Sequence, residues 1–401
     1  MKRGHADLPL HYGTVPPWLA QRMSLLGGAI VEAIVMEYGI HAFLQRMSDP
    51  FWFQSLGCVL GMDWHSSGIT TSVMNALKKS VNLRSADLGL YICGGRGKSS
   101  RQTPHELLDI AYRTGLDGDK LVRTSKLSAK VDNTAVQDGF QLYLHSFILS
   151  KDGEWAVIQQ GMNTVGRLAR RYHWLSSRLK SFTEEPHTSV CGKNIGPILN
   201  LTDKNATPTK SGILTLTGEA PGKIMKEVNL VMPTRHNVKS GDVDMKRLGA
   251  ALILAHETGV EDFESLLLLQ GVGPRTLQSL TLVSEVIHGT PSRFSDPARF
   301  SFAHGGKDGH PFPVPTKVYD ETINIFDKAI HSSKLGYKDK SEALKNLSKV
   351  SASMGKKYTP RDYFDDLLKK ENADSYKYGG KTVYGDTPKP EEGRQLTIWD
   401  Q

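Results

Sequence analysis

The sequence predicts a mixed α/β fold, in which an N-terminal domain of strands and helices precedes a mostly helical domain and a flexible C-terminal tail. In the first part, apolar runs of strand type such as 88–93 alternate with runs of helical period such as 18–47. Beyond residue 240 the helical period dominates, and beyond 335 polar residues prevail. We therefore expect three parts, which span 1–235, 240–332 and 335–401.

The individual elements follow from local patterns in chain order. Asp152-Gly153 lies between two apolar runs and predicts a β-hairpin, because Asp-Gly adopts the positive φ angles of a tight turn. Gly115 predicts the end of a helix. We expect helices at 18–47, 69–81, 105–115 and 163–181; strands at 58–64, 88–93, 140–150 and 154–162; short strands and turns over 187–235; and loops at 207–212 and 218–222.

Composition indicates an ordinary globular chain with a basic excess. The 401 residues are enough for two or three domains, and the net charge of +8 fits a polyanionic partner. Three cysteines are too few for a disulfide scaffold or a Cys-rich zinc site, which points to a reducing cytoplasm. The N-terminus is polar, and the apolar run 24–39 carries two glutamates and is shorter than a membrane span. We expect a cytoplasmic protein without a targeting segment or a membrane partner.

The stretch LLLLQGVGPRTLQSL (266–280) predicts two short helices joined by a glycine-rich turn. Glycines let the backbone approach a phosphate closely, and the helix that begins at Pro274 directs free N–H groups and its positive dipole end toward that phosphate. Arg275 adds a charged contact. The expected DNA-binding residues of this turn are Gly271, Val272, Gly273, Arg275 and Thr276.

This segment resembles the helix-hairpin-helix element of DNA repair proteins, in its two glycines and flanking leucines. The resemblance implies binding to the DNA backbone, and a structural helix–helix turn is the alternative. The following stretch HPFPVPTKVYDETI (310–323) is similar to the one that carries a catalytic aspartate in helix-hairpin-helix DNA glycosylases. Pro315 stands at the position of that aspartate, which weakens a glycosylase function.

Polar residues in the N-terminal domain predict a metal-dependent active site. Asp63 and His65 lie two positions apart at the end of the expected strand 58–64, a spacing that places both on one face, and carboxylates and imidazoles follow further along the chain. Such groups bind Mg²⁺ or Mn²⁺, and two such ions can hold the oxygens of a phosphodiester during hydrolysis. The alternative is that these residues cap turns or stabilise the core. The predicted metal ligands are Asp63, His65, Asp132, Asp138, His145 and Glu154, and the predicted catalytic residues are Asp63, Asp138, Glu154 and the charge-stabilising Lys130.

Basic residues outside the glycine turn are candidates for further phosphate contacts. The loop CGGRGKSS (93–100) departs from a nucleotide-binding loop, because Ile92 stands where the first glycine is required. The expected helix 163–181 carries a cluster of arginines, and the loop 302–312 carries a lysine between histidines. The predicted contacts are Arg96, Lys98, Arg170, Arg171 and Lys307.

The C-terminal heptapeptide QLTIWDQ (395–401) resembles the short peptides that dock into DNA sliding clamps. An expected disordered tail has little physical reason to end in exposed apolar residues unless they dock, although the tail could instead fold back on its own domain. The matching positions are Gln395, Leu396, Ile398 and Trp399.

Over residues 7–330 the chain resembles a family of archaeal and bacterial proteins of unassigned function, in strings such as FQSLGCVLGMDWHSSGITT and KLSAKVDNTAVQDGFQLY. The resemblance implies a prokaryotic cytoplasmic protein and no particular activity. We therefore hypothesise a divalent-metal-dependent nuclease that acts on DNA in repair or replication, with RNA as a possible substrate. The alternatives are a non-enzymatic DNA-binding or repair adaptor and a DNA glycosylase-like enzyme.

Overall fold

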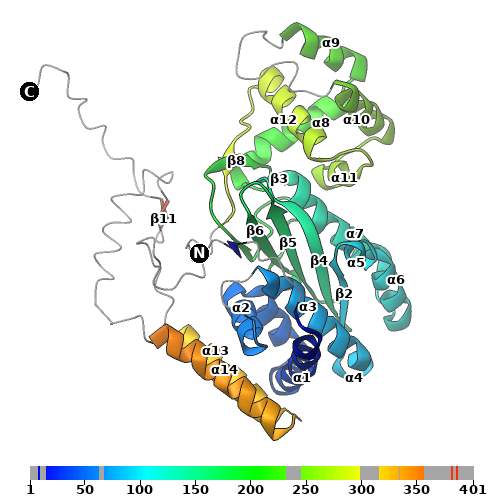
Figure 1. Ribbon diagram of the computed structural model, residues 1–401. Coiled ribbons are helices and arrows are strands. Elements are labelled where there is room, and N and C mark those ends of the chain that lie inside the picture. Colours follow the sequence, from blue (N-terminus) through cyan, green and yellow to red (C-terminus); the bar gives the residue numbers. More distant parts are fainter. Residues whose placement is uncertain are drawn as a thin grey trace, which may run out of the picture.

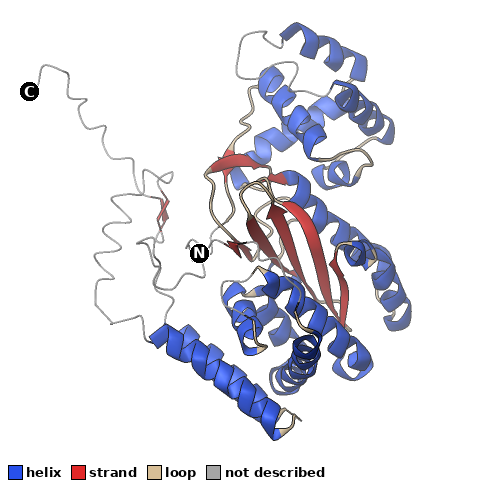
Figure 2. Cartoon of the chain, in the orientation of Figure 1, coloured by secondary structure: helices blue, strands red, loops and turns tan. Residues whose placement is uncertain are grey.

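The computed structural model of the chain is shown in Figure 1. It describes residues 8–9, 15–62, 67–231, 245–298, 316–333, 335–355, 381–382 and 385–386. Strands form a central layer, and helices cover it on both faces and at one end (Figure 2). The predicted mixed α/β class is confirmed.

A six-stranded antiparallel sheet forms the central layer. Its long hairpin turns at Asp152-Gly153, where Gly153 has a φ of +86°, as the sequence predicts. The strand order is β1-β6-β5-β4-β2, with β7 paired to β6. The bounds are β1 Leu8–Pro9, β2 Leu90–Arg96, β4 Gln141–Ser150, β5 Trp155–Asn163, β6 Leu168–Leu175 and β7 Ser189–Cys191.

A second antiparallel sheet has three short strands in the order β3-β8-β9 and lies between the main sheet and the helical domain (Figure 1). Its β9 comes from far along the chain and pairs with β8, so the chain returns to the sheets after the helical domain. The bounds are β3 Val136–Gln137, β8 Pro197–Asn200 and β9 Phe294–Ser295. A separate pair joins β10 Lys381–Thr382 to β11 Gly385–Asp386.

Each face of the main sheet packs into its own hydrophobic core, because side chains alternate between the faces of a strand. Ile148, Ala156 and Ile158 belong to the core of the N-terminal and C-terminal helices. Phe147 and Val157 point to the opposite face and belong to the core that continues into the helical domain. The first face is covered by α1 Pro17–Ser48, α2 Pro50–Val59 and α3 Gly68–Val81. Helices α13 Thr316–Ser332 and α14 Tyr337–Gly355 pack in turn on α1 and α2. The remaining helices of the N-terminal part are α4 Ser85–Leu88, α5 Lys98–Arg101, α6 Thr103–Thr114 and α7 Gly118–Lys130.

Helix α1 is long and apolar enough to cross a membrane by length and composition alone, a test that the core helix of a globular protein also passes. Here it packs against α3 and the sheet, and Ile30, Val31 and Ile34 have no exposed surface. Its packing therefore accounts for its apolar sequence.

The helical domain consists of helices that pack on one another at one end of the sheets (Figure 1). Leu266, Leu277 and Leu280 are fully buried in its core. Packing contacts cross the predicted domain boundaries; for example, α8 packs on α10 and α12, and α13 packs on α1. The bounds are α8 Thr207–Gly218, α9 Pro221–Val231, α10 Met245–Thr258, α11 Phe263–Leu268 and α12 Pro274–His288.

Several predicted elements are wrong. The expected strand 58–64 begins inside α2, whose residues are buried on all sides, so no helical period marks it. The expected helix 163–181 is wrong because this range contains strand β6. Arg170 and Arg171 of that strand are buried and paired, so they do not form the solvated face of a helix. The expected loop 207–212 is the first part of α8.

Candidate functional site

The predicted glycine turn joins α11 to α12. Asp262 caps α11 by accepting hydrogen bonds from the Ser265 amide and hydroxyl, at 2.8 and 2.7 Å. Gly271 has a φ of +86°, a left-handed conformation that favours glycine. Gly273 caps α12 with extended backbone, and Pro274 occupies the first turn. The predicted helix–turn–helix arrangement is therefore present.

The turn presents its backbone outward. Gly271, Pro274 and Arg275 are exposed, and a Cβ atom built at Gly271 or Gly273 meets nothing within 4 Å. The first amides of a helix have no partner within it. In the described part of the chain, no acceptor contacts the amides of Gly273, Arg275 or Thr276. The backbone N–H groups at the start of α12 are thus available to an anion.

Two of the predicted DNA-binding residues have side chains that hold the turn from inside. Val272 is buried in the core of the helical domain. Thr276 is also buried, and its hydroxyl donates to the Gly271 carbonyl at 3.0 Å. The side chains of Val272 and Thr276 therefore shape the turn. The Val272 backbone is engaged as well, because its amide donates to the Leu269 carbonyl at 3.3 Å and its carbonyl accepts from Lys130.

The N-terminal domain supports the turn through two side chains that flank residues 131–135. Lys130 Nζ donates to the Val272 carbonyl at 2.5 Å, and Gln137 Nε2 donates to the Pro274 carbonyl at 2.8 Å. Burial lowers the pKa of Lys130. The predicted role of Lys130 at a metal site is wrong in this structure, because its ammonium group fixes the turn instead.

Between these two supports, the π-helical turn Val131–Ala135 carries Asp132 into a buried polar network. Asp132 Oδ2 accepts from Gln159 Nε2 at 2.6 Å and from Trp174 Nε1 at 3.0 Å, and Oδ1 contacts His187 Nε2 at 2.5 Å. Burial raises the pKa of Asp132. His187 is not among the residues that the sequence predicts, because no motif marks it and its partner lies 55 positions earlier.

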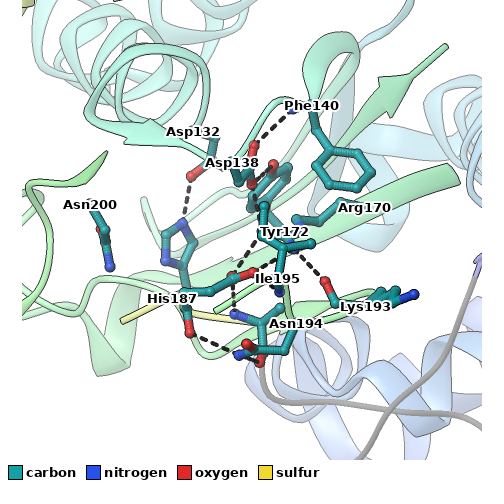
Figure 3. Close-up of polar contacts among 12 residues, drawn as sticks. Asp132, Asp138, Phe140, Arg170, Tyr172, His187, Lys193, Asn194, Ile195 and Asn200 are labelled. Carbon is teal, nitrogen blue, oxygen red and sulfur yellow. Dashed lines mark hydrogen bonds and ion pairs between the residues drawn. The ribbon is translucent and has the colours of Figure 1, made fainter. Parts of the chain in front are cut away.

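His187 lines a small cavity of about 40 Å³. Figure 3 shows the ring with one nitrogen toward Asp132 and the other on the side of Asn200. Carboxylate, hydroxyl and amide side chains surround this space. The lining residues are Glu185, His187, Thr188, Ser189, Val190, Asn200, Thr202, Asp203, Ser295 and Pro297.

Arg170 and two carboxylates form a buried ion-pair cluster next to this network (Figure 3). Arg170 donates to Asp138 at 2.8 Å and to both oxygens of Asp296, at 2.9 and 2.8 Å. Tyr172 donates to Asp138 at 2.6 Å. Burial raises the pKa of Asp138, and Arg170 opposes that effect. Because Asp296 follows β9, the cluster ties the chain after the helical domain to the main sheet.

The described members of the predicted metal site do not form one. Asp132 and Asp138 are engaged as above, and Glu154 pairs with His41 near the surface, at 2.9 Å. His145 contacts Ser125 and Gln159, and burial lowers its pKa to about 4, so its imidazole is neutral at pH 7. In the residues that the structure describes, no three His, Cys, Asp or Glu side chains could hold a metal ion. Asp63 and His65 lie outside those residues.

The predicted basic contacts divide into three groups. Arg96 and Lys98 are exposed at the end of β2 and the start of α5, as a phosphate contact requires. Arg170 and Arg171 have no exposed surface, so the prediction that they contact DNA is wrong. Arg171 instead donates to His173 and to Gln54. Lys307, Gln395, Leu396, Ile398 and Trp399 lie outside the described residues.

Comparison with known proteins identifies the family. The chain belongs to the family described as "Protein of unknown function (DUF763)", whose model matches residues 4–314. No curated protein and no solved structure matches the chain. The match confirms the family membership that the sequence strings indicate, and it assigns no activity.

Proposed function

We propose that this protein binds DNA through the turn between α11 and α12, as a helix-hairpin-helix element, and that it serves in DNA processing. The observation that supports this most strongly is the geometry of the turn from Gly271 to Arg275, in which Gly271, Pro274 and Arg275 are exposed. It combines a left-handed glycine, open space at both glycines and the amide-bearing start of α12.

These groups suit a phosphate for electrostatic and steric reasons. The amides at the start of a helix carry partial positive charge, and a side chain at either glycine would keep a phosphate at a distance. Arg275 is exposed beside them and adds a full positive charge. Contacts of this kind hold the sugar-phosphate backbone without reading bases, so we expect little sequence preference and some binding to RNA.

The supports from the N-terminal domain also favour a binding role. Lys130 and Gln137 both donate to carbonyl groups of the turn, namely those of Val272 and Pro274. Because these bonds engage carbonyl oxygens, they do not occupy the amides of Gly273, Arg275 and Thr276, which have no acceptor among the described residues. The turn is thus held in one conformation before any ligand binds, which lowers the entropy cost of binding.

Substitution of Arg275 tests the charged part of this surface. We expect Arg275→Ala to weaken binding of a fluorescein-labelled DNA duplex several-fold and to reduce the slope of log affinity against log salt by about 1, because one phosphate contact is lost. The measurement is fluorescence anisotropy at several NaCl concentrations.

The matched control is Arg293→Ala. Arg293 is also exposed in the helical domain but follows the opposite end of α12. Equal losses of affinity in the two variants would indicate a general charge effect and would contradict a specific contact at the turn.

The hydrolytic part of the hypothesis is separate from DNA binding. A nuclease that uses Mg²⁺ or Mn²⁺ would depend on Asp63 and His65, since the described candidate ligands are engaged elsewhere. Incubation of end-labelled DNA with each metal distinguishes the two functions: metal-dependent strand scission supports the nuclease, and binding without scission supports the adaptor. Sliding-clamp docking by residues 395–401 stays a prediction from the sequence.

A further inference from the structure

We propose that the cavity beside His187 binds a hydroxyl or ammonium group of a small neutral or cationic ligand, and that Nδ1 of His187 accepts a hydrogen bond from that group. This site is distinct from the DNA-binding turn, and the proposal does not rest on DNA binding.

The first step of the argument is the fixed orientation of the imidazole. Asp132 accepts from Gln159 Nε2 and Trp174 Nε1 and lies against His187 Nε2. An ionised Asp132 can only accept a hydrogen bond. It therefore selects the neutral tautomer of His187 that carries its hydrogen on Nε2 and a lone pair on Nδ1. An aromatic contact adds to this constraint, since Trp174 packs edge-on against the His187 ring at a centroid distance of 4.7 Å. The protein therefore presents Nδ1 as a hydrogen-bond acceptor.

The second step is that Nδ1 is left for a ligand. The His187 side chain is only 5% exposed, so this nitrogen is largely withdrawn from bulk water. No residue in the described part of the chain hydrogen-bonds to this nitrogen, and the ring lines the cavity. An acceptor that lines a cavity and has no partner within the protein is open to a hydrogen-bond donor of a ligand.

The third step concerns the charge and size of the cavity. Glu185 and Asp203 line it, together with the hydroxyl-bearing Thr188 and Thr202, and none of its lining residues is Lys or Arg. Two carboxylates repel an anion such as phosphate and favour a cation or a hydrogen-bond donor. A volume of about 40 Å³ admits about three water-sized atoms, the size of one small functional group with its attached carbon. The ligand therefore inserts a single functional group and leaves the rest of itself outside.

The contact that forms is a hydrogen bond. The O–H or N–H of the ligand donates to the lone pair on Nδ1 and keeps its proton, because an alcohol or an ammonium is a weaker acid than imidazolium. Asp132 accepts the Nε2–H of the same ring and so keeps the lone pair on Nδ1. Asp132 acts as a positioning residue, and His187 is the group that contacts the ligand.

Nuclear magnetic resonance of ¹⁵N-histidine-labelled full-length protein tests the proposal, with His187 assigned from the His187→Gln spectrum. We expect the pattern of a ring protonated on Nε2 alone. Ethanolamine, which carries both proposed groups, should shift the His187 resonances in a saturable way, whereas inorganic phosphate at equal ionic strength should not. Asp203→Asn should raise the half-saturating ethanolamine concentration about tenfold. If Asp203→Asn does not fold, Glu185→Gln is measured in its place, with the same expected rise in the half-saturating concentration.

The matched control is Asp119→Asn, which changes an exposed carboxylate in the first turn of α7 and should leave the titration unchanged. A ring protonated on Nδ1, a response to phosphate in place of ethanolamine, or no response to 0.1 M ethanolamine would each overturn the proposal.

Discussion

Replacing Arg170 with methionine is expected to lower the free energy of unfolding by about 3–5 kcal/mol. Arg170 has no exposed surface and is the shared partner of Asp138 and Asp296, whose side chains are equally buried. Methionine preserves much of the volume but leaves two buried carboxylates without their counter-charge. Urea unfolding at pH 7, followed by circular dichroism, measures the change.

The reason given for that loss can be tested by removing the carboxylates as well. Asp138→Asn and Asp296→Asn combined with Arg170→Met should be more stable than Arg170→Met alone, because no unpaired charge is then buried. Arg178→Met, at an exposed arginine just after β6, should change stability by less than about 0.5 kcal/mol. If Arg178→Met lost as much stability as Arg170→Met, or if the triple variant were no more stable than Arg170→Met, this account of the cluster would be contradicted.

Acid is expected to destabilise the protein through His145. Burial lowers the pKa of folded His145 to about 4 from the ordinary 6.5. Between those values the unfolded chain binds a proton that the folded chain does not, so stability rises with pH. The free energy of unfolding is therefore unaffected by the titration of His145 above pH 6.5 and decreases as the pH falls toward 4. The expected decrease between pH 7 and 4.5 is about 2–3 kcal/mol.

His145→Gln provides the comparison, since glutamine does not titrate and can still hydrogen-bond to Ser125 and Gln159. Other acid-sensitive groups, such as the buried His173, are present in both proteins, and their effects cancel in the difference. The variant should therefore lose about 2–3 kcal/mol less than the wild type between pH 7 and 4.5. Parallel pH profiles for the two proteins would show that His145 does not titrate in this way.

The elements that the sequence predicts well are those with local signals. Gly115, Gly153 and Gly271 each adopt a positive φ that favours glycine, and the structure has the predicted turn or helix end at each. The turn between α11 and α12 is recognisable for this reason: its conformation depends on residues that are close together in the chain.

The candidate sites were harder to predict because they depend on distant partners. Arg170 in β6 has the sequence appearance of a solvated cation, and its partners Asp138 and Asp296 lie 32 and 126 positions away. Lys130 contacts a carbonyl 142 positions later. His187 follows the same pattern with Asp132. No local period or motif encodes these pairs, and only the folded sheet brings them together.

The central claim is that a phosphate approaches the backbone at Gly271 and Gly273, and Gly273→Ala tests it most directly. Gly273 has a φ of −124°, which alanine adopts without strain, and the added Cβ meets no atom within 4 Å. The variant should therefore unfold at the wild-type temperature but bind labelled duplex DNA about tenfold more weakly, while Gly222→Ala, at an exposed glycine of α9, should bind normally. Wild-type affinity in folded Gly273→Ala would contradict the claim.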